Sequence, residues 1–257
     1  MALPTPSVFD SLVEVGQKLL PYAEQVSSRL YELRRAGIRI LFEGAQGTML
    51  DVDHGSYPYV TSSSSTAGGA CTGTGLAPTR ITGAIGIAKA YTTRVGAGPF
   101  PTELLDERGK LLQDRGHEYG AVTGRPRRTG WFDVPVARYA SMLNGLNTIA
   151  LTKLDVLDAF DEIGVCIAYR FRGETVDFVP SCIKDFGEVE PVYETFPGWS
   201  QSTVGVSRFE DLPDRARAYV AALESLVGVE IGLVSTGPER DETIIVPGGR
   251  IDEWTRA

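Results

Sequence analysis

Residues 147–158 read NTIALTKLDVLD, a short apolar run that passes directly into charged residues. Positions 148–151 suit a buried strand, because a continuous apolar run of this length fits a strand that is covered on both faces. Lys153 and Asp155 follow two positions apart, so an extended backbone would place their side chains on one face. Ligands of open α/β sheets bind at the carboxyl ends of strands, which is where this pair stands.

The Lys153 and Asp155 pair suits guanine chemically. A carboxylate can accept hydrogen bonds from both the ring N1–H and the 2-amino group of guanine, and the apolar stem of a lysine can lie over the flat base. Adenine offers no such pair of donors. The alternative interpretation is a surface ion pair at the end of a strand, with no role in binding.

Two further segments repeat the pattern of an apolar run followed by polar residues and glycine. Ile38–Phe42 is suited to a buried strand and leads into Glu43-Gly-Ala-Gln-Gly47, and a strand at 229–234 leads into Ser235-Thr-Gly-Pro238. If these strands are parallel, the loops that contain Gln46, Lys153 and Ser235 lie at one edge of a sheet.

The remaining elements follow from periodicity and from capping residues. We expect one or two amphipathic helices over 8–36 with a break at Pro21, a helix near 134–144 that Asp133 caps, and a helix over 213–227. Strands are expected within 84–95 and at 164–171, 175–179 and 243–246. The predicted fold is α/β: a largely parallel central sheet flanked by helices, with small extra strand and loop subregions, forming a single region over residues 1–257.

A second chemically distinctive stretch is GAVTGRPRRTGW at 120–131, in which three arginines occupy four positions. Glycines let the backbone approach a ligand closely, and guanidinium groups bind carboxylates or phosphates through two hydrogen bonds. Pro126 favours an extended backbone at Arg125, so Arg125 and Arg127 should project in defined directions. We predict an anion-binding loop; the alternative is a solvated turn.

Composition limits the classes of partner. The chain has 25 basic and 33 acidic residues and a net charge of −8, which argues against nucleic acid and anionic membranes as partners. No apolar run approaches the roughly 20 residues of a membrane span. The three cysteines are odd in number and lack metal-site spacing, so we expect neither disulfides nor a bound metal in this chain, and a cytoplasmic location.

The segment 51–78 is poor in large apolar residues and predicts a long functional loop. His54 is interpreted as a hydrogen-bonded structural residue rather than as an acid or a metal ligand. The glycine-rich positions 68–75 match neither common nucleotide-binding loop.

Taken in order, six segments closely resemble the adenylosuccinate synthetase family over residues 8 to 246. They are FEGAQGTMLDVDHGSYPYVTSS (42–63), TRVGAGPFPTE (93–103), GAVTGRPRRTGWFD (120–133), LTKLDVLD (151–158), YETFPGWS (193–200) and STGP (235–238). The resemblance implies a P-loop-NTPase-like fold, and a homodimeric ligase that uses GTP and Mg²⁺ to join L-aspartate to inosine monophosphate (IMP). The products are adenylosuccinate, GDP and phosphate.

The resemblance also implies roles for single residues. Gln46 would stabilise the 6-oxygen of IMP, and Thr61 and Arg125 would also bind IMP. The aspartate loop would comprise Ala121, Val122, Thr123, Gly124, Arg125 and Arg127. Arg127 would also bind GTP, together with Lys153, Leu154, Asp155, Ser235, Thr236 and Gly237.

One departure from the family pattern affects activity. Members begin with a phosphate loop of the type GDEGKGK, which supplies the catalytic aspartate and a magnesium ligand, and a histidine acid follows; neither is present in this sequence. We therefore expect the chain to be a carboxyl-terminal part that is inactive alone, with the Mg²⁺ ligands in the missing amino-terminal part. The chain would then be a truncated form, a split subunit whose partner is a separate amino-terminal part, or an incomplete gene product. Two alternatives stay open: a guanine-nucleotide-binding module without catalysis, and a non-functional remnant whose loops stay disordered.

Overall fold

The computed structural model describes residues 5–120 and 124–256. These residues form two compact units, which are described separately. The first unit comprises residues 5–43 and Ala70–Arg80, and the second comprises Gly44–Gly69 and the chain from Ile81 onward. Every described candidate site residue belongs to the second unit. The single region predicted for residues 1–257 stays a prediction.

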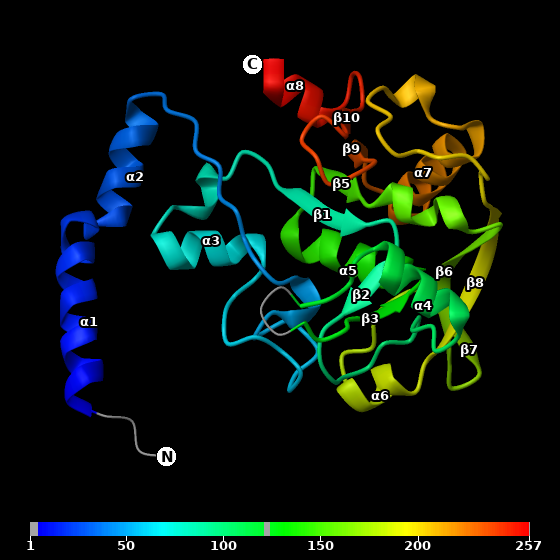
Figure 1. The fold of residues 1–257 in the computed structure, drawn as a ribbon, viewed down its shortest axis with the longest axis horizontal. Coiled ribbons are helices and arrows are strands. Elements are labelled where there is room, and N and C mark those ends of the chain that lie inside the picture. Colours follow the sequence, from blue (N-terminus) through cyan, green and yellow to red (C-terminus); the bar gives the residue numbers. More distant parts are fainter. Residues whose placement is uncertain (1–4, 121–123, 257) are drawn as a thin grey trace. The chain divides into compact units, whose positions relative to one another are not determined.

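The first unit is helical. It contains α1 (Thr5–Leu19), a short 3₁₀ turn at Leu20–Tyr22 and α2 (Val26–Arg35), so the predicted break at Pro21 is confirmed (Figure 1). Proline ends α1 because it lacks an N–H donor.

The strand predicted at Ile38–Phe42 is absent, and that prediction was wrong. A strand exists only through hydrogen bonds to a neighbouring strand, and this segment pairs with none among the described residues. Ile38 and Leu41 are 54% and 86% exposed, so the apolar run is not buried either.

The second unit is built on a sheet of order β1-β5-β9-β10. β1 (Ile85–Lys89), β5 (Thr148–Thr152) and β9 (Ile231–Ser235) run parallel, and β10 (Thr243–Ile245) is antiparallel to β9. The four strands are visible side by side in Figure 1. The predicted α/β fold with a largely parallel central sheet is confirmed.

The helices of the second unit begin and end where the sequence carries capping residues. The Asp133 side chain accepts a hydrogen bond from the Val136 N–H (3.1 Å) at the start of α5 (Val134–Asn144), which Gly145 ends in the left-handed conformation. Gly228 ends α7 (Asp214–Val227) in the same way. α5 packs against α7, and both α7 and α8 (Arg250–Arg256) pack against β9.

The remaining elements form smaller layers. β2 (Thr92–Arg94) pairs with β3 (Arg128–Gly130), and α4 (Glu107–Arg115) packs against β3. A second sheet joins β4 (Phe132–Asp133), β6 (Glu162–Phe171) and β7 (Glu174–Val176), and β8 (Glu190–Pro197) pairs with β6. A short helix, α6 (Ile183–Gly187), precedes β8.

The core lies between the central sheet, α7 and the second sheet. Its fully buried members include Leu151, Leu154, Ile163 and Leu223, and Trp131 packs edge-on against Phe160 with ring centroids 5.2 Å apart. This packed core fixes the carboxyl ends of the parallel strands, from which the site residues project.

The segment 51–78, predicted as a loop, contains a helix, α3 (Ala67–Thr74), that the sequence did not predict. Its first N–H groups need an acceptor, and Asn144 of α5 supplies one, because its side-chain oxygen accepts from the Ala67 N–H at 2.7 Å. Because this acceptor lies 77 positions away along the chain, the residues around α3 do not predict it.

Candidate functional site

The strand register brings Lys89, Lys153 and Ser235 to one edge of the central sheet. Lys89 of β1 lies opposite Thr152 of β5, and Thr152 directly precedes Lys153. The Lys153 N–H donates to the Ser235 hydroxyl at 3.2 Å. The loops after β5 and β9 therefore meet, as expected for parallel strands.

The backbone after β5 is not extended. Lys153 adopts a left-handed conformation (φ 61°, ψ 38°), and residues Leu154–Ala159 form a 3₁₀ helix. We had expected Lys153 and Asp155 to share one face if the backbone stayed extended, and that condition is not met. The left-handed turn is needed because the chain must leave the sheet directly after Thr152, while Leu154 enters the core with a fully buried side chain.

Asp155 is partly buried and its side chain has no cationic partner within 4.0 Å among the described residues. Burial is the main cause that raises the pKa of its carboxyl, and the nearby Asp158 carboxylate adds to the effect. A partly buried acceptor without a cation is suited to neutral N–H donors.

The loop after β9 is shaped by its own contacts. Thr236 is fully buried and its hydroxyl donates to the Val206 carbonyl at 2.8 Å. Gly237 packs directly against a carboxylate, because a Cβ atom added there would lie 2.2 Å from Glu242 Oε2. A side chain at this position would require the Glu242 carboxylate to move.

The arginine loop is a closed turn between β-bridged segments. Tyr119 and Pro126 form an isolated antiparallel bridge, the Arg127 N–H donates to the Glu118 carbonyl at 2.8 Å, and the Gly124 N–H donates to the Gly120 carbonyl at 2.8 Å. Gly124 adopts a left-handed conformation with φ 63°. Ala121, Val122 and Thr123 lie outside the described residues.

The three arginines of this loop are in different situations. Arg125 is exposed, and its side chain has no hydrogen bond or ion pair with any residue that the structure describes. Arg127 is half-buried and donates to Glu118 Oε2 at 2.8 Å. Arg128 is bound to both carboxylate oxygens of Glu103 and to the Gly98 carbonyl, so its role is structural.

A buried carboxylate that sequence reasoning missed lies at the centre of the site. Glu118 is fully buried and accepts from Lys89 Nζ (2.7 Å), Tyr91 Oη (2.6 Å), Arg127 Nη1 (2.8 Å) and Lys153 Nζ (3.1 Å). Burial alone would raise the pKa of its carboxyl, but the hydrogen bonds from Lys89, Tyr91 and Arg127 outweigh burial and hold the pKa at about 2. The local signal was an acidic residue two positions before the basic loop.

The excess of positive charge in this cluster defines its chemistry. One carboxylate faces three cations, whose side chains are 24% (Lys89), 31% (Arg127) and 34% (Lys153) exposed. Two positive charges are left without a counter-charge in the cluster, and all three groups reach solvent. The arrangement is suited to bind an anionic ligand.

Gln46 and Thr61 lie on a loop that Asp51 organises. The buried Asp51 carboxylate accepts from the N–H groups of residues 53, 54, 65 and 66. The Thr61 N–H donates to the Leu50 carbonyl at 2.7 Å, and its hydroxyl lies 3.2 Å from that of Ser63. Gln46 is exposed with φ 64°, and it does not follow a strand, contrary to expectation.

No contact joins Gln46 or Thr61 to Lys153 or Ser235 among the contacts found for the described residues. The structure therefore brings together the arginine loop and the two loops of the central sheet, whereas Gln46 and Thr61 stand on a separate loop. The His54 N–H donates to Asp51, and its carbonyl accepts from the Tyr139 hydroxyl at 2.8 Å.

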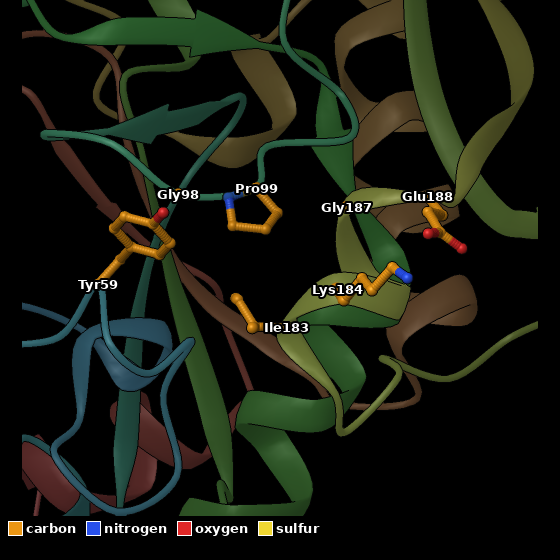
Figure 2. A pocket seen from close by; sticks show the side chains of 7 residues that line it. All are labelled: Tyr59, Gly98, Pro99, Ile183, Lys184, Gly187 and Glu188. Atoms are coloured by element: carbon orange, nitrogen blue, oxygen red, sulfur yellow. The ribbon is translucent and has the colours of Figure 1, made fainter.

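A separate hollow of about 410 Å³ lies between α6, Tyr59 and the turn at Gly98 and Pro99 (Figure 2). Figure 2 shows Tyr59, Pro99 and Ile183 on one side and the charged ends of Lys184 and Glu188 on the other. None of the candidate site residues lines it.

No group of three or more His, Cys, Asp or Glu residues in residues 5–120 and 124–256 could hold a metal ion. Within the same residues, no helix is both long enough and apolar enough to cross a membrane.

Comparison with known proteins identifies the relatives of the chain. A family model described as adenylosuccinate synthetase matches residues 3–244. The chain is 57% identical over 245 residues to adenylosuccinate synthetase of Geobacter sulfurreducens, covering 94% of this chain and 57% of the relative. It is 53% identical over 246 residues to that of Solibacter usitatus, covering 96% of this chain and 57% of the relative.

Structural comparison agrees. The chain superimposes with a TM-score of 0.92 on a fully ligated adenylosuccinate synthetase from Plasmodium falciparum, at 36% identity, covering 95% of this chain and 59% of the other. The chain spans a little under three fifths of the length of the relatives that it matches. On this evidence the chain belongs to the adenylosuccinate synthetase family.

Proposed function

We propose that the chain takes part in the GTP-dependent ligation of L-aspartate to IMP, which yields adenylosuccinate, GDP and phosphate. Membership of the family supports the reaction. The observation that carries the proposal is the cluster around Glu118, because it joins Arg127 of the aspartate loop to Lys153 of the guanine loop.

In the proposed reaction, the γ-phosphoryl group of GTP is transferred to the 6-oxygen of IMP. The aspartate amine then attacks C6, a C–N bond forms, and the C6–O bond breaks as inorganic phosphate leaves. Gln46 stabilises the 6-oxygen as negative charge develops there, since a side-chain amide can donate to an oxyanion. Thr61 and Arg125 hold IMP.

Aspartate binds at residues 121–125 and at Arg127. The exposed guanidinium of Arg125 is available for one of its carboxylates, and Arg127 keeps donors beyond the one that Glu118 accepts. Arg127 also faces GTP. Because phosphate and carboxylate are both anions, the two positive charges left over in the cluster attract either ligand.

The loops after β5 and β9 bind the guanine base. Asp155 accepts from the ring N1–H and the 2-amino group, and the stem of Lys153 lies over the base. Ser235, Thr236 and Gly237 line the other side. Leu154 is fully buried, so its contact with the nucleotide is through its backbone.

Mg²⁺ supplies charge neutralisation on the polyphosphate in this reaction class. We propose that its protein ligands lie in the phosphate-loop region that the family pattern includes, since no group of three or more His, Cys, Asp or Glu residues that could hold a metal ion was found among the described residues. We propose a homodimer as the working form. We also propose a cytoplasmic location, which the three free cysteines support.

The proposal is tested by following adenylosuccinate formation with GTP, IMP and aspartate. The assay is run with the chain alone, and again after addition of the amino-terminal segment of the Geobacter sulfurreducens relative that precedes the matched region. We expect turnover only in the second case, with no product if any one substrate is omitted. Robust turnover by the chain alone would show that it is complete.

A guanine-nucleotide-binding module without catalysis is the second candidate. The hydrogen bond from the Lys153 N–H to the Ser235 hydroxyl favours it, because it joins the two loops that we assign to guanine. It predicts GDP binding and no turnover in either assay. The remnant hypothesis predicts that residues 120–130 exchange amide hydrogens equally fast with and without GDP.

A further inference from the structure

Glu118 stands at the meeting point of four chain segments. It follows α4 through a turn at Gly116 and His117, and its partners come from β1, from the turn after it, from the arginine loop and from the end of β5. A carboxylate that is fully buried must be paired, because an unpaired buried charge is strongly unfavourable.

The two carboxylate oxygens divide their partners. Oε1 accepts from Lys89, Tyr91 and Lys153, and Oε2 accepts from Arg127. A single side chain thus fixes one residue that we assign to aspartate and GTP and another that we assign to guanine. No comparable link between these two loops exists among the described residues.

The contact with Lys153 has a geometric consequence. Its ammonium group donates to Glu118 and to the Gly116 carbonyl, while its N–H donates to Ser235. Both ends of the residue are therefore tied down. The aliphatic stem between them, which is the part suited to contact a flat base, has a fixed course.

We propose that Glu118 is a positioning residue that holds Arg127 and Lys153 together in their binding conformations and so couples the aspartate loop to the guanine loop. Its role rests on the proposed function, because the two residues it holds are assigned through that function. Glu118 itself is buried and does not touch the ligand.

A merely structural role makes a different prediction. If Glu118 only stabilises the fold, its replacement would lower affinity by an amount independent of Lys153. If it acts through the ammonium group of Lys153, removal of that group cancels the effect of replacing Glu118. A double-mutant cycle measures this dependence directly.

The cycle compares wild type, Glu118→Gln, Lys153→Met and the double variant by calorimetric titration with GDP. Methionine keeps the apolar stem and removes the charge. We expect each single variant to bind about tenfold more weakly, the typical effect of losing a charged hydrogen bond. We expect the double variant to match the weaker single variant within about twofold.

Glu103→Gln is the matched control. Glu103 also binds an arginine of the same loop, Arg128, but contacts no candidate site residue. We expect its affinity for GDP to stay within about twofold of wild type. If Glu118→Gln fails to fold, Glu118→Asp replaces it in the cycle. The shorter side chain keeps the charge but cannot reach all four donors. We then expect a smaller loss of GDP affinity, which Lys153→Met should again cancel.

Amine acetylation provides a readout that needs no nucleotide. In wild type, Lys89 and Lys153 should react more slowly than the exposed Lys110 and Lys184, and replacement of Glu118 should remove the difference. Additive losses in the cycle, or unchanged acetylation rates in the Glu118 variant, would overturn the positioning role while leaving the proposed function intact. Absence of GDP binding by wild type would instead refute guanine recognition, and the coupling role with it.

Discussion

Acidification should destabilise this chain through Glu118, and the size of the effect follows from its contacts. The pKa of the carboxyl falls from an ordinary 4.5 to about 2 in the folded state. The difference of about 2.5 between these values corresponds to about 3 kcal/mol of stability. Because the folded-state pKa is lowered, this contribution is fully present above pH 4.5 and is lost as the pH falls toward 2.

The assay is urea unfolding of wild type and Glu118→Gln at pH 6 and at pH 3.5. At pH 6 the variant should be less stable by about 3 kcal/mol, because it lacks the ionised carboxylate that Lys89, Arg127 and Lys153 share. At pH 3.5 Glu118 is largely protonated in the unfolded wild-type chain. The difference in the free energy of unfolding between wild type and Glu118→Gln should therefore be smaller by about 1.5 kcal/mol than at pH 6. A gap that is equal at both pH values would refute the reasoning, since Glu118 would then not be ionised by its partners.

Three further predictions concern side chains of contrasting surroundings. Arg125→Ala should change the free energy of unfolding by less than about 0.5 kcal/mol, because the side chain is exposed, yet it should abolish aspartate-dependent turnover in the complemented assay. Arg128→Ala should lower the free energy of unfolding by about 1–3 kcal/mol, because the hydrogen bonds from Arg128 to the Glu103 carboxylate are lost. The pKa of the buried Asp133 is raised to about 6, mainly by burial, so its contribution to stability should fall as the pH rises from about 4 through 6. Asp133→Asn should remove that pH dependence in the same unfolding experiment, and an unchanged profile would contradict it.

The sequence predicted those elements whose causes are local. The helix after Asp133 is confirmed because capping and a proline in its first turn are readable from neighbouring residues. The parallel strands that end at Thr152 and Ser235 are confirmed because short continuous apolar runs are typical of buried strands.

The errors arose where distant parts of the chain decide the local structure. An apolar run at Ile38–Phe42 does not become a strand without a neighbour to pair with. Lys153 takes a left-handed conformation because Leu154 must enter the core, which the spacing of Lys153 and Asp155 alone cannot reveal.

The candidate site shows the same division. The arginine loop was recognisable from composition, but the separate roles of its arginines depend on Glu103 and Glu118, which belong to other segments. Glu118 was missed because three of its four partners lie 27 to 35 positions away along the chain. A buried carboxylate of this kind is found only once the topology is known.

Recognition of guanine is the central claim, and calorimetric titration of the chain with GDP and with ADP tests it most directly. We predict measurable GDP binding and at least tenfold weaker ADP binding, since adenine lacks the paired donors that the Asp155 carboxylate accepts. Asp155→Ala should weaken GDP binding by about 10- to 150-fold, the equivalent of about 1.5–3 kcal/mol for a charged acceptor, and should remove the preference. Equal affinity for GDP and ADP in the wild-type chain would contradict the account.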